Sequence, residues 1–313
     1  MGETNSKRKY GIWLIRALGS AAFLNVLSRF LPIEDVAAAV GRIDVQTFVG
    51  VVIVFLLIHV AAAFKWRWLM GPALTPAVAV HAHYAGLAAN LCLPGAVGGD
   101  VVRVGLAQAH IGDIGTDVAA SAIDRAIDIV ALLTVSVIGL SMFASGDTVS
   151  AFTLRTVIVL VLIIGGLVYL PQISQFAWKI IPRLPGRKLV GRLAAAFRQA
   201  AADPFKLVGV LVAATSIQAV LVILTWWLAI AAGAEVALDH WMFAWPLAKI
   251  IADLPVSLNG LGLREASLAA LLVQYGADPA AVVAAGLVWQ AVLFLAGGLG
   301  GLVFLLTRRS AQS

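Results

Sequence analysis

Several stretches of this chain run for about twenty residues with few charged side chains, the length that a helix needs to cross the hydrocarbon core of a bilayer. A soluble domain is roughly 45–50% apolar. The present chain of 313 residues is 61% hydrophobic, and its mean hydropathy is +0.98. One soluble core cannot bury that much apolar surface, so the sequence predicts an all-α polytopic membrane protein.

The basic residues cluster in a few places, which predicts how the chain is oriented. They occur at the N-terminus, at Lys65 and Arg67, throughout residues 171–203, and at Arg308 and Arg309. Cytoplasmic loops carry an excess of Lys and Arg. The net charge of +6 is therefore expected to reflect membrane topology rather than nucleic-acid binding. We expect both termini in the cytoplasm and the protein in the cytoplasmic (inner) membrane.

The apolar segments predict about six full spans. The basic N-terminus followed by an apolar run also occurs in signal peptides. Arg16, Asn25 and Arg29 interrupt the run here, which favours an uncleaved first span. Residues 33–44 have helical spacing of apolar residues and indicate an interfacial helix. The spans are expected at residues 11–31, 45–70, 114–144, 152–170, 205–232 and 280–306.

Two glycine-rich and proline-containing stretches break otherwise apolar sequence. Leu93–Arg103 and Leu254–Arg264 share the pattern L-P-x-x-x-x-G-x-x-x-R. Each joins two half-length apolar limbs, so we expect two re-entrant broken-helix hairpins, at residues 75–110 and 241–276. On the expected topology they enter from opposite sides, as in an inverted-topology repeat, whose broken helices flank the substrate near the midplane.

The expected organisation follows from these assignments. A cytoplasmic N-terminus is followed by two membrane halves separated by a basic cytoplasmic loop with a surface helix, and a short cytoplasmic tail ends the chain. The corresponding ranges are 1–10, 11–170, 171–203, 204–307 and 308–313.

The breaks and one charged pair together resemble a known family. The motifs are Pro94-Gly95-x-x-Gly98-Gly99-Asp100-x-x-Arg103, Asp124-Arg125, and Leu254-Pro255-x-Ser257-x-Asn259-Gly260-Leu261-Gly262-x-Arg264-Glu265. They resemble the lysylphosphatidylglycerol synthase transmembrane, or flippase-like, family over nearly the whole chain. The resemblance implies a membrane domain that moves aminoacylated phosphatidylglycerol between leaflets. In the best-known relatives a soluble C-terminal domain makes that lipid; the chain ends at Ser313 without it, so synthesis is not implied.

The breaks are also candidate phosphate sites. A helix N-terminus presents free backbone N–H groups to an anion, and arginine adds a bidentate phosphate ligand. We expect Arg103 and Arg264 to approach each other near the midplane. Alternatively, the two arginines pair with Asp100 and Glu265. The candidate headgroup residues are Gly98, Gly99, Asp100, Arg103, Arg125, Asn259, Gly260, Gly262 and Arg264.

Further charges lie inside apolar sequence, where a charge costs roughly 2.5–3.5 kcal/mol by insertion scales and function is the default interpretation. Arg125 is expected to meet a lipid phosphate or a hairpin acid, or else to help lock a span to a hairpin by a salt bridge. Lys249 and Asp253, four residues apart, are expected to pair with each other. The candidates for charge balance or proton transfer are Asp124, Asp128, Lys249, Asp253 and Glu265.

Other polar positions suggest packing rather than chemistry. His81 and His83 are two apart and do not share a helix face, which argues against a metal site. Gly297 and Gly301 form a G-x-x-x-G pattern typical of close helix packing. Lys65-Trp66-Arg67-Trp68 is typical of an interfacial anchor. We expect no cofactor.

The leading hypothesis is a lipid translocator for a lipid with an anionic phosphate headgroup, such as an aminoacyl-phosphatidylglycerol or a polyprenyl-phosphate-type lipid. The alternative is a proton-coupled secondary transporter of a small anion. We expect no enzymatic activity, since the sequence shows no nucleophile–base pair, metal cluster or cofactor loop. The expected partners are membrane lipids and a separate lipid-synthesising or glycosylating enzyme. The sequence leaves open the lipid, the direction, the energy source and the oligomeric state.

Overall fold

The computed structural model describes residues 32–92, 98–111, 114–144, 149–158, 203–253 and 260–310, together with Asn25, Gly146, Phe176, Lys179 and Gly191. These residues form helices joined by turns, without a strand among them, so the all-α prediction is confirmed for this part of the chain. The expected first span and the basic loop lie almost entirely outside the described residues, as does most of the expected span 152–170. Of the two breaks, residues 93–97 and 254–259, which contain the prolines, also lie outside them.

The described helices follow the expected segments closely. In chain order they are α2 (Ile33–Arg42), α3 (Val45–Met70), α4 (Pro76–Cys92), α5 (Gly98–Ile111), α6 (Ile114–Phe143), a short apolar helix at Val149–Ile158, α10 (Pro204–Ala232), α11 (Leu238–Ala252), α12 (Leu263–Leu272), the 3-10 turn η1 (Val273–Tyr275) and α13 (Pro279–Ser310). By length and apolarity, four described segments can cross a membrane: Val45–Met70, Ala120–Phe143, Pro204–Ala232 and Pro279–Phe304. The protein is therefore a multi-pass membrane protein.

Side-chain caps fix where two of the spans begin. Asp44 accepts hydrogen bonds from the Thr47 backbone N–H and hydroxyl at 2.8 Å each, at the start of α3. Asp203 accepts from the Lys206 N–H at 3.0 Å at the start of α10. Each cap satisfies a backbone donor that has no partner within the helix.

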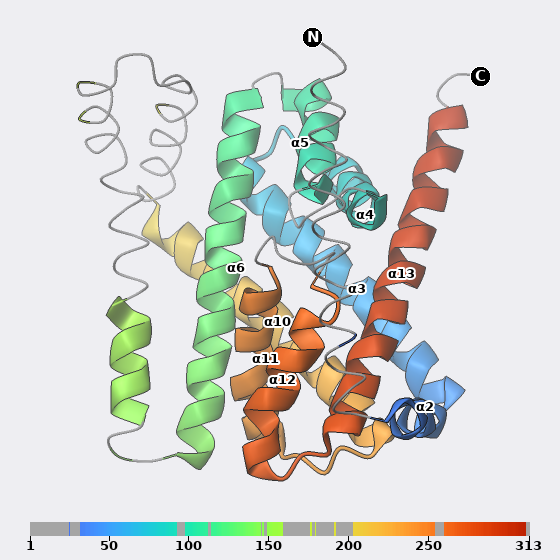
Figure 1. Ribbon diagram of the computed structural model, residues 1–313. Helices are drawn as coiled ribbons and strands as arrows, with labels where there is room; N and C mark the ends of the chain where they lie inside the picture. The colour runs from blue at the N-terminus through green and yellow to red at the C-terminus, as the bar shows by residue number, and fades with distance from the viewer. Residues whose placement is uncertain are drawn as a thin grey trace.

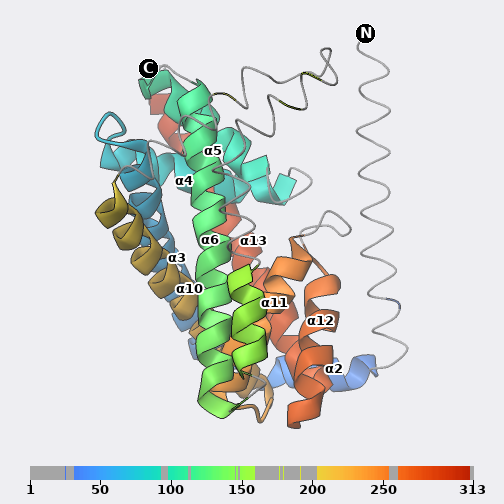
Figure 2. The ribbon, with the colours of Figure 1, turned by 90° about the vertical axis from the view of Figure 1, so that its left-hand side faces the viewer.

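Helix α6 runs through the centre of the molecule in both ribbon views, with α11 packed against it (Figures 1 and 2). The contact is close because Gly139 has no side chain. A methyl group there would lie 2.6 Å from the Phe243 backbone nitrogen. Ser136 strengthens the contact by donating a hydrogen bond to the Phe243 carbonyl at 2.8 Å.

The G-x-x-x-G prediction for α13 is confirmed. Gly297 and Gly301 lie against Leu91 and Ala88 of α4, and a methyl group on the intervening Gly300 would lie 2.5 Å from the Tyr84 carbonyl oxygen. This glycine face lets α4 cross α13 closely. Figure 1 looks nearly along α4, and Figure 2 shows it from the side, transverse to α6.

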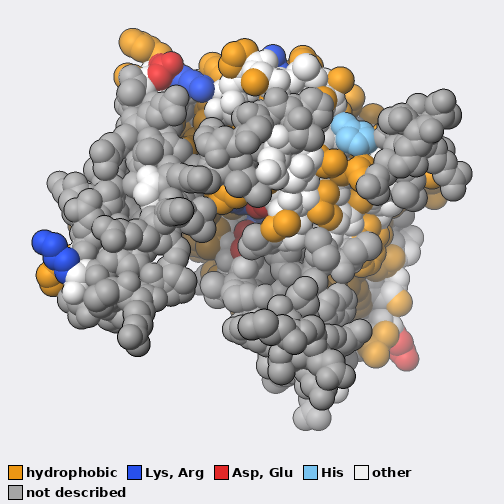
Figure 3. All heavy atoms as spheres, turned by 90° about the horizontal axis from the view of Figure 1, so that it is seen from above, with side chains coloured by type: hydrophobic (Ala, Val, Ile, Leu, Met, Phe, Trp, Pro, Cys, Tyr) orange, Lys and Arg blue, Asp and Glu red, His pale blue; other side chains and the backbone are white. Residues whose placement is uncertain are grey.

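The two broken regions occupy different levels along α6. Helices α4 and α5 pack together near the end where α3 and α13 end and α6 begins, whereas α11 and α12 pack together nearer the opposite end (Figures 1 and 2). Figure 3 views the first end, and acidic side-chain atoms show there in a depression bordered by hydrophobic side chains. Polar groups are therefore accessible from this end of the molecule.

Candidate functional site

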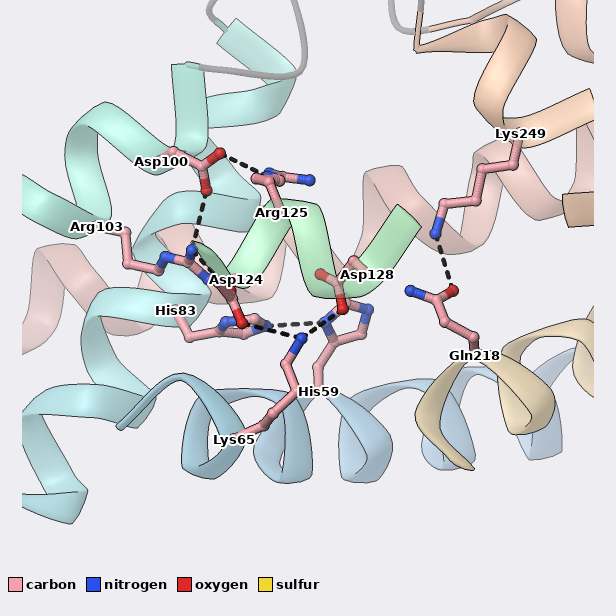
Figure 4. A network of polar contacts seen from close by, with 10 residues as sticks. All are labelled: His59, Lys65, His83, Asp100, Arg103, Asp124, Arg125, Asp128, Gln218 and Lys249. Carbon is pink, nitrogen blue, oxygen red and sulfur yellow. Dashed lines mark hydrogen bonds and ion pairs between the residues drawn. The ribbon is translucent and has the colours of Figure 1, made fainter. Parts of the chain in front are cut away.

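A cavity of about 200 Å³ lies among α3, α4, α5, α6, α10 and α11, and charged side chains line it. Six helices contribute, so the site is assembled from residues that are distant in sequence. Figure 4 shows the polar side chains turned toward one another around this space. The charged lining residues are Lys65, Asp100, Arg103, Asp124, Arg125, Asp128 and Lys249.

Asp124 of α6 is at the centre of the charge network. Its carboxylate oxygens lie 3.0 Å from Lys65 Nζ of α3 and 3.0 Å from Arg103 Nη2 of α5. Only 2% of Asp124 is exposed. Lys65 also pairs with Asp128, one turn further along α6. A buried charge is costly unless it is paired, so these contacts are what allow Asp124 to be a carboxylate here.

Asp100 connects the start of α5 to α6. It accepts from Arg125 Nε at 2.6 Å and pairs with Arg103 Nη2 at 3.2 Å. This contact is common to both alternatives considered from sequence, an acid that Arg125 meets and a salt bridge that holds α6 to α5. Arg103 also lies over the Trp66 ring, with its guanidinium carbon 4.5 Å from the ring centroid, a favourable cation–π position.

Lys249 differs from the other cations of the cavity. Its Nζ donates to the Gln218 side-chain oxygen at 3.1 Å, and no ion pair joins it to a carboxylate among the described residues. The expected pair with Asp253 is wrong: Asp253 caps the end of α11 and is exposed, whereas Lys249 turns toward α10. Lys249 is thus a cavity-lining cation whose partner is neutral.

Two histidines add a hydrogen-bonded pair to the wall. His59 Nδ1 and His83 Nε2 lie 2.9 Å apart, joining α3 to α4, and the ring of Phe55 packs against His59 at 4.2 Å. His83 Nδ1 is buried and has no hydrogen-bond partner within the described part of the chain. One ring nitrogen in this contact must carry a proton and the other must accept it. No described group of three His, Cys, Asp or Glu side chains is placed to hold a metal ion.

The lining holds one more positive than negative charge. Four cations, from α3, α5, α6 and α11, face three carboxylates, from α5 and α6. The carboxylates are bound within the network of Lys65, Arg103 and Arg125. The excess charge is consequently on the Lys249 side of the cavity. An anion entering the cavity would complete the charge balance.

The start of α5 is not a free anion site, in contrast to the sequence-based expectation. The Gly99 N–H donates to the Asn90 side-chain oxygen at 2.7 Å. A methyl group on Gly99 would lie 2.4 Å from the Gly86 carbonyl oxygen, so α4 and α5 touch here backbone to backbone. Gly98 begins α5, whereas Pro94 and Gly95 lie outside the described residues. The glycines serve close packing, and the cavity receives the side chains that follow them.

The second break forms a separate polar network. The Gly262 N–H donates to Glu265 at 2.7 Å, and Glu265 also pairs with Arg264 at 2.6 Å. Arg264 donates to the Gly286 carbonyl of α13 at 3.1 Å and lies over Trp245. Glu265 is 1% exposed and Arg264 is 5% exposed. This arrangement is the alternative considered from sequence, in which Arg264 pairs with Glu265.

Arg103 and Arg264 consequently do not meet in one site. Arg264 is not among the residues that line the central cavity. Gly260 and Gly262 adopt left-handed backbone conformations, with φ of +77° and +81°, that favour glycine. Asn259 lies outside the described residues. Of the described headgroup candidates, the residues that line the cavity are Gly99, Asp100, Arg103 and Arg125.

Sequence reasoning missed several members of the site. Lys65 and Trp66 were assigned to an interfacial anchor, but Lys65 is 5% exposed and Trp66 is fully buried, while Trp68 faces outward. Since 100° separates successive residues on a helix, only part of such a cluster can face lipid. His59, Asn90 and Gln218 carry no spacing signal that separates them from packing residues.

Comparison with protein families gives one match. The model for the lysylphosphatidylglycerol synthase TM region matches residues 13–301, which is most of the chain. No curated protein matches the chain. The matched region contains every charged residue of the cavity, including the Asp124–Arg125 pair and the break ending at Arg103. The chain therefore belongs to the lysylphosphatidylglycerol synthase transmembrane-region family.

Proposed function

We propose that the protein is a lipid translocator that moves a lipid with an anionic phosphate headgroup between leaflets. The observation that carries the proposal is the positive excess of the central cavity, with Lys249 hydrogen-bonded to a neutral partner. A phosphodiester carries the single negative charge that would balance it. The family match supports a role in lipid handling.

The headgroup is proposed to lie between Lys249 and Arg103. Arg103 already has two carboxylate partners, so its charge is largely balanced. Its proposed role is to orient the phosphate by hydrogen bonding. Its Nε is buried and has no hydrogen-bond partner among the described residues, which would let it donate to a bound headgroup. Arg264 is given a structural role, because Glu265 balances its charge, and Glu265 and the Gly286 carbonyl accept hydrogen bonds from its Nε and Nη2.

The finer topology is part of the proposal. The chain would have about six full spans and two re-entrant hairpins, α4–α5 and α11–α12, related as an inverted repeat. The close packing within each pair and their different levels along α6 support this arrangement. Both termini would be cytoplasmic in the inner membrane, since α3, with Arg67 in its last turn, and α13 end on the same side of the molecule (Figure 1). The cavity would then face the cytoplasmic side.

The protein is proposed to act without catalysing a covalent reaction, alongside a separate enzyme that makes or modifies its lipid. Aminoacyl-phosphatidylglycerol and polyprenyl-phosphate-type lipids both present the required phosphate. The excess of one positive charge favours headgroups whose net charge is negative. Competition between the two lipid classes for translocation tests whether the net charge of the headgroup decides which lipid is preferred.

A translocation assay in proteoliposomes tests the proposal. Fluorescent phosphatidylglycerol in the inner leaflet is protected from dithionite, and protein-mediated exchange exposes it. We expect the wild-type protein to expose the lipid and Lys249→Met to slow the exchange at least ten-fold. Lys206→Met removes a cation outside the cavity and serves as the control. Equal rates for wild type and empty liposomes would reject the proposal.

A second candidate is a proton-coupled transporter of a small anion, and the His59–His83 pair favours it. A hydrogen-bonded imidazole pair in the cavity wall could take up a proton as an anion enters. Uptake of radiolabelled inorganic phosphate into proteoliposomes under an imposed pH gradient separates the two candidates. Phosphate uptake without lipid movement would favour this one.

A further inference from the structure

A second space adjoins the cavity, between α3 and α10. It has a volume of about 590 Å³, and its lining is mainly apolar. Helices α3 and α10 pack side by side, as Figure 2 shows, and the space runs along their outer faces. Its lining residues are Ile58, Ala61, Phe64, Lys65, Arg67, Trp68, Ala213, Ser216, Ile217 and Val220. We call these residues the α3–α10 groove.

The groove lies on the outer face of two helices that are long and apolar enough to span a membrane, a face that lipid would cover. Ala61, Phe64, Trp68 and Ser216 are exposed. A polar ligand would gain little from contact with such an apolar surface. Hydrocarbon chains would bind there favourably, because apolar surface is buried on both sides of the contact.

The groove and the cavity share a wall. Lys65 and Ile217 line both spaces, one residue from each helix. Lys65 places its ammonium group on Asp124, while its aliphatic stem is available to cover the groove. Only one layer of side chains separates the two spaces. A molecule whose polar head lies in the cavity could therefore extend its apolar part past Lys65 and Ile217 into the groove.

The dimensions of the groove fit one leaflet. The lining on α3 runs from Ile58 to Trp68, which at 1.5 Å per residue is about 15 Å of helix. The hydrocarbon core of a bilayer is about 30 Å thick, so one leaflet is about half of that. Trp68 packs on Gly209 and narrows one end. Arg67 lies near the same end, where a phosphate would enter.

We propose that the α3–α10 groove holds the acyl chains of the lipid whose phosphate headgroup lies in the central cavity. The inference rests on the proposed function and adds a lateral path to it: the lipid enters sideways between α3 and α10, with Lys65 and Ile217 as the gate. Another apolar groove, lined by α3, α4 and α13, shares no residue with the cavity and is not assigned this role.

Tryptophan substitutions that fill the groove test the proposal. Ala61→Trp fills it from α3, and Ser216→Trp fills it from α10. Leu57→Trp and Val212→Trp are the matched controls, because both positions are exposed on the same helices outside the groove. We expect the two groove variants to slow translocation of fluorescent phosphatidylglycerol at least ten-fold and the controls to stay within two-fold of wild type.

A headgroup analogue that lacks acyl chains distinguishes headgroup binding in the cavity from acyl-chain binding in the groove. Binding of radiolabelled glycerol 3-phosphate to the purified protein should be the same in all four variants and wild type, because none of them lines the cavity. If wild type moves lipid and the groove variants match the controls, the groove assignment is wrong and the proposed function stands. If wild type moves no lipid at all, the proposed function fails, and the groove assignment fails with it.

A crosslinking experiment on the wild-type protein does not depend on the folding of any variant. Phosphatidylglycerol with a diazirine in its acyl chain is photolysed in proteoliposomes, and the adducts are located by peptide mass spectrometry. We expect adducts on residues 58–68 and 213–220 that excess unlabelled phosphatidylglycerol suppresses. Suppressible adducts confined to α4 and α13 would instead overturn the assignment.

Discussion

Replacing Lys249 by methionine separates the binding role of a cavity residue from a structural role. Among the residues that the structure describes, the ammonium group has only the Gln218 side-chain oxygen as its partner, at 3.1 Å. A hydrogen bond to a charged group contributes about 1.5–3 kcal/mol. Each 1.4 kcal/mol is a factor of ten in affinity. If Lys249 binds the phosphate, the affinity for glycerol 3-phosphate should fall by about 10- to 150-fold, taking these values together.

Stability should respond differently, because Lys249→Met leaves no carboxylate without a partner. The loss is limited to one hydrogen bond from a charged group, about 1.5–3 kcal/mol, which is less than the roughly 3–5 kcal/mol expected when a buried ion pair is broken. Thermal unfolding of the detergent-purified protein measures stability, and equilibrium binding of radiolabelled glycerol 3-phosphate measures affinity. Lys206→Met controls for the removal of one positive charge. Unchanged affinity, or a loss of affinity that only parallels unfolding, would refute the assignment of Lys249 to the headgroup.

Four further predictions follow from particular contacts. Lys65→Met leaves Asp124 and Asp128 without their shared cation and should lower the unfolding free energy by about 3–5 kcal/mol; adding Asp128→Asn should recover part of the loss, and purely additive effects would contradict the pairing. Gly99→Ala brings a methyl group within 2.4 Å of the Gly86 carbonyl oxygen and should cost about 1–3 kcal/mol, whereas Gly105→Ala on the same helix meets nothing within 4 Å and should not destabilise; similar melting temperatures for both would argue against the α4–α5 contact. Glu265→Gln leaves the Arg264 guanidinium buried without its counter-charge and should cost about 3–5 kcal/mol, while Arg264→Met with Glu265→Gln should unfold at a higher temperature than Glu265→Gln alone. The Thr47 backbone N–H and hydroxyl lower the pKa of Asp44, so its contribution to stability is present above the ordinary carboxyl pKa and is lost as the pH falls through the lowered one; Asp44→Asn, which still caps α3, should remove that part of the pH dependence, as acid-unfolding curves of the two proteins would reveal.

The sequence predicted the helices well because apolar length and caps are local properties. The span expected at 45–70 is α3, and the span expected at 205–232 begins one residue earlier as α10. Asp203 and Pro204 provide a capping residue followed by a proline at the first helical position. The Gly297–Gly301 face was predictable for the same reason, since glycine spacing alone determines where helices can approach.

The composition of the site could be predicted only in part. Charges inside apolar runs pointed to Asp124, Arg125, Asp128 and Lys249 as candidates, and all four line the cavity. Their partners depend on helix rotation and on which helices meet. Lys249 turns to Gln218 on α10 rather than to its neighbour along α11, a choice that spacing within one helix cannot decide.

Sequence symmetry was a poorer guide to geometry. The two breaks share a proline, a glycine and an arginine at equal spacing, yet Arg103 is paired across helices with Asp124, and Arg264 is paired with the adjacent Glu265. A glutamate follows Arg264, whereas a valine occupies position 104 after Arg103. Arg264 pairs with the acid next to it, whereas Arg103 pairs with Asp100 of its own helix and with Asp124 of α6.

The most direct test of the central claim compares three probes with the wild-type protein in one proteoliposome preparation: fluorescent phosphatidylglycerol, fluorescent phosphatidylcholine and radiolabelled glycerol 3-phosphate. The positive excess of the cavity and the groove beside it predict that phosphatidylglycerol crosses fastest, that zwitterionic phosphatidylcholine crosses more slowly, and that glycerol 3-phosphate is not accumulated. Movement of all three probes at the rate of protein-free liposomes would contradict the account, and so would accumulation of glycerol 3-phosphate without movement of either lipid.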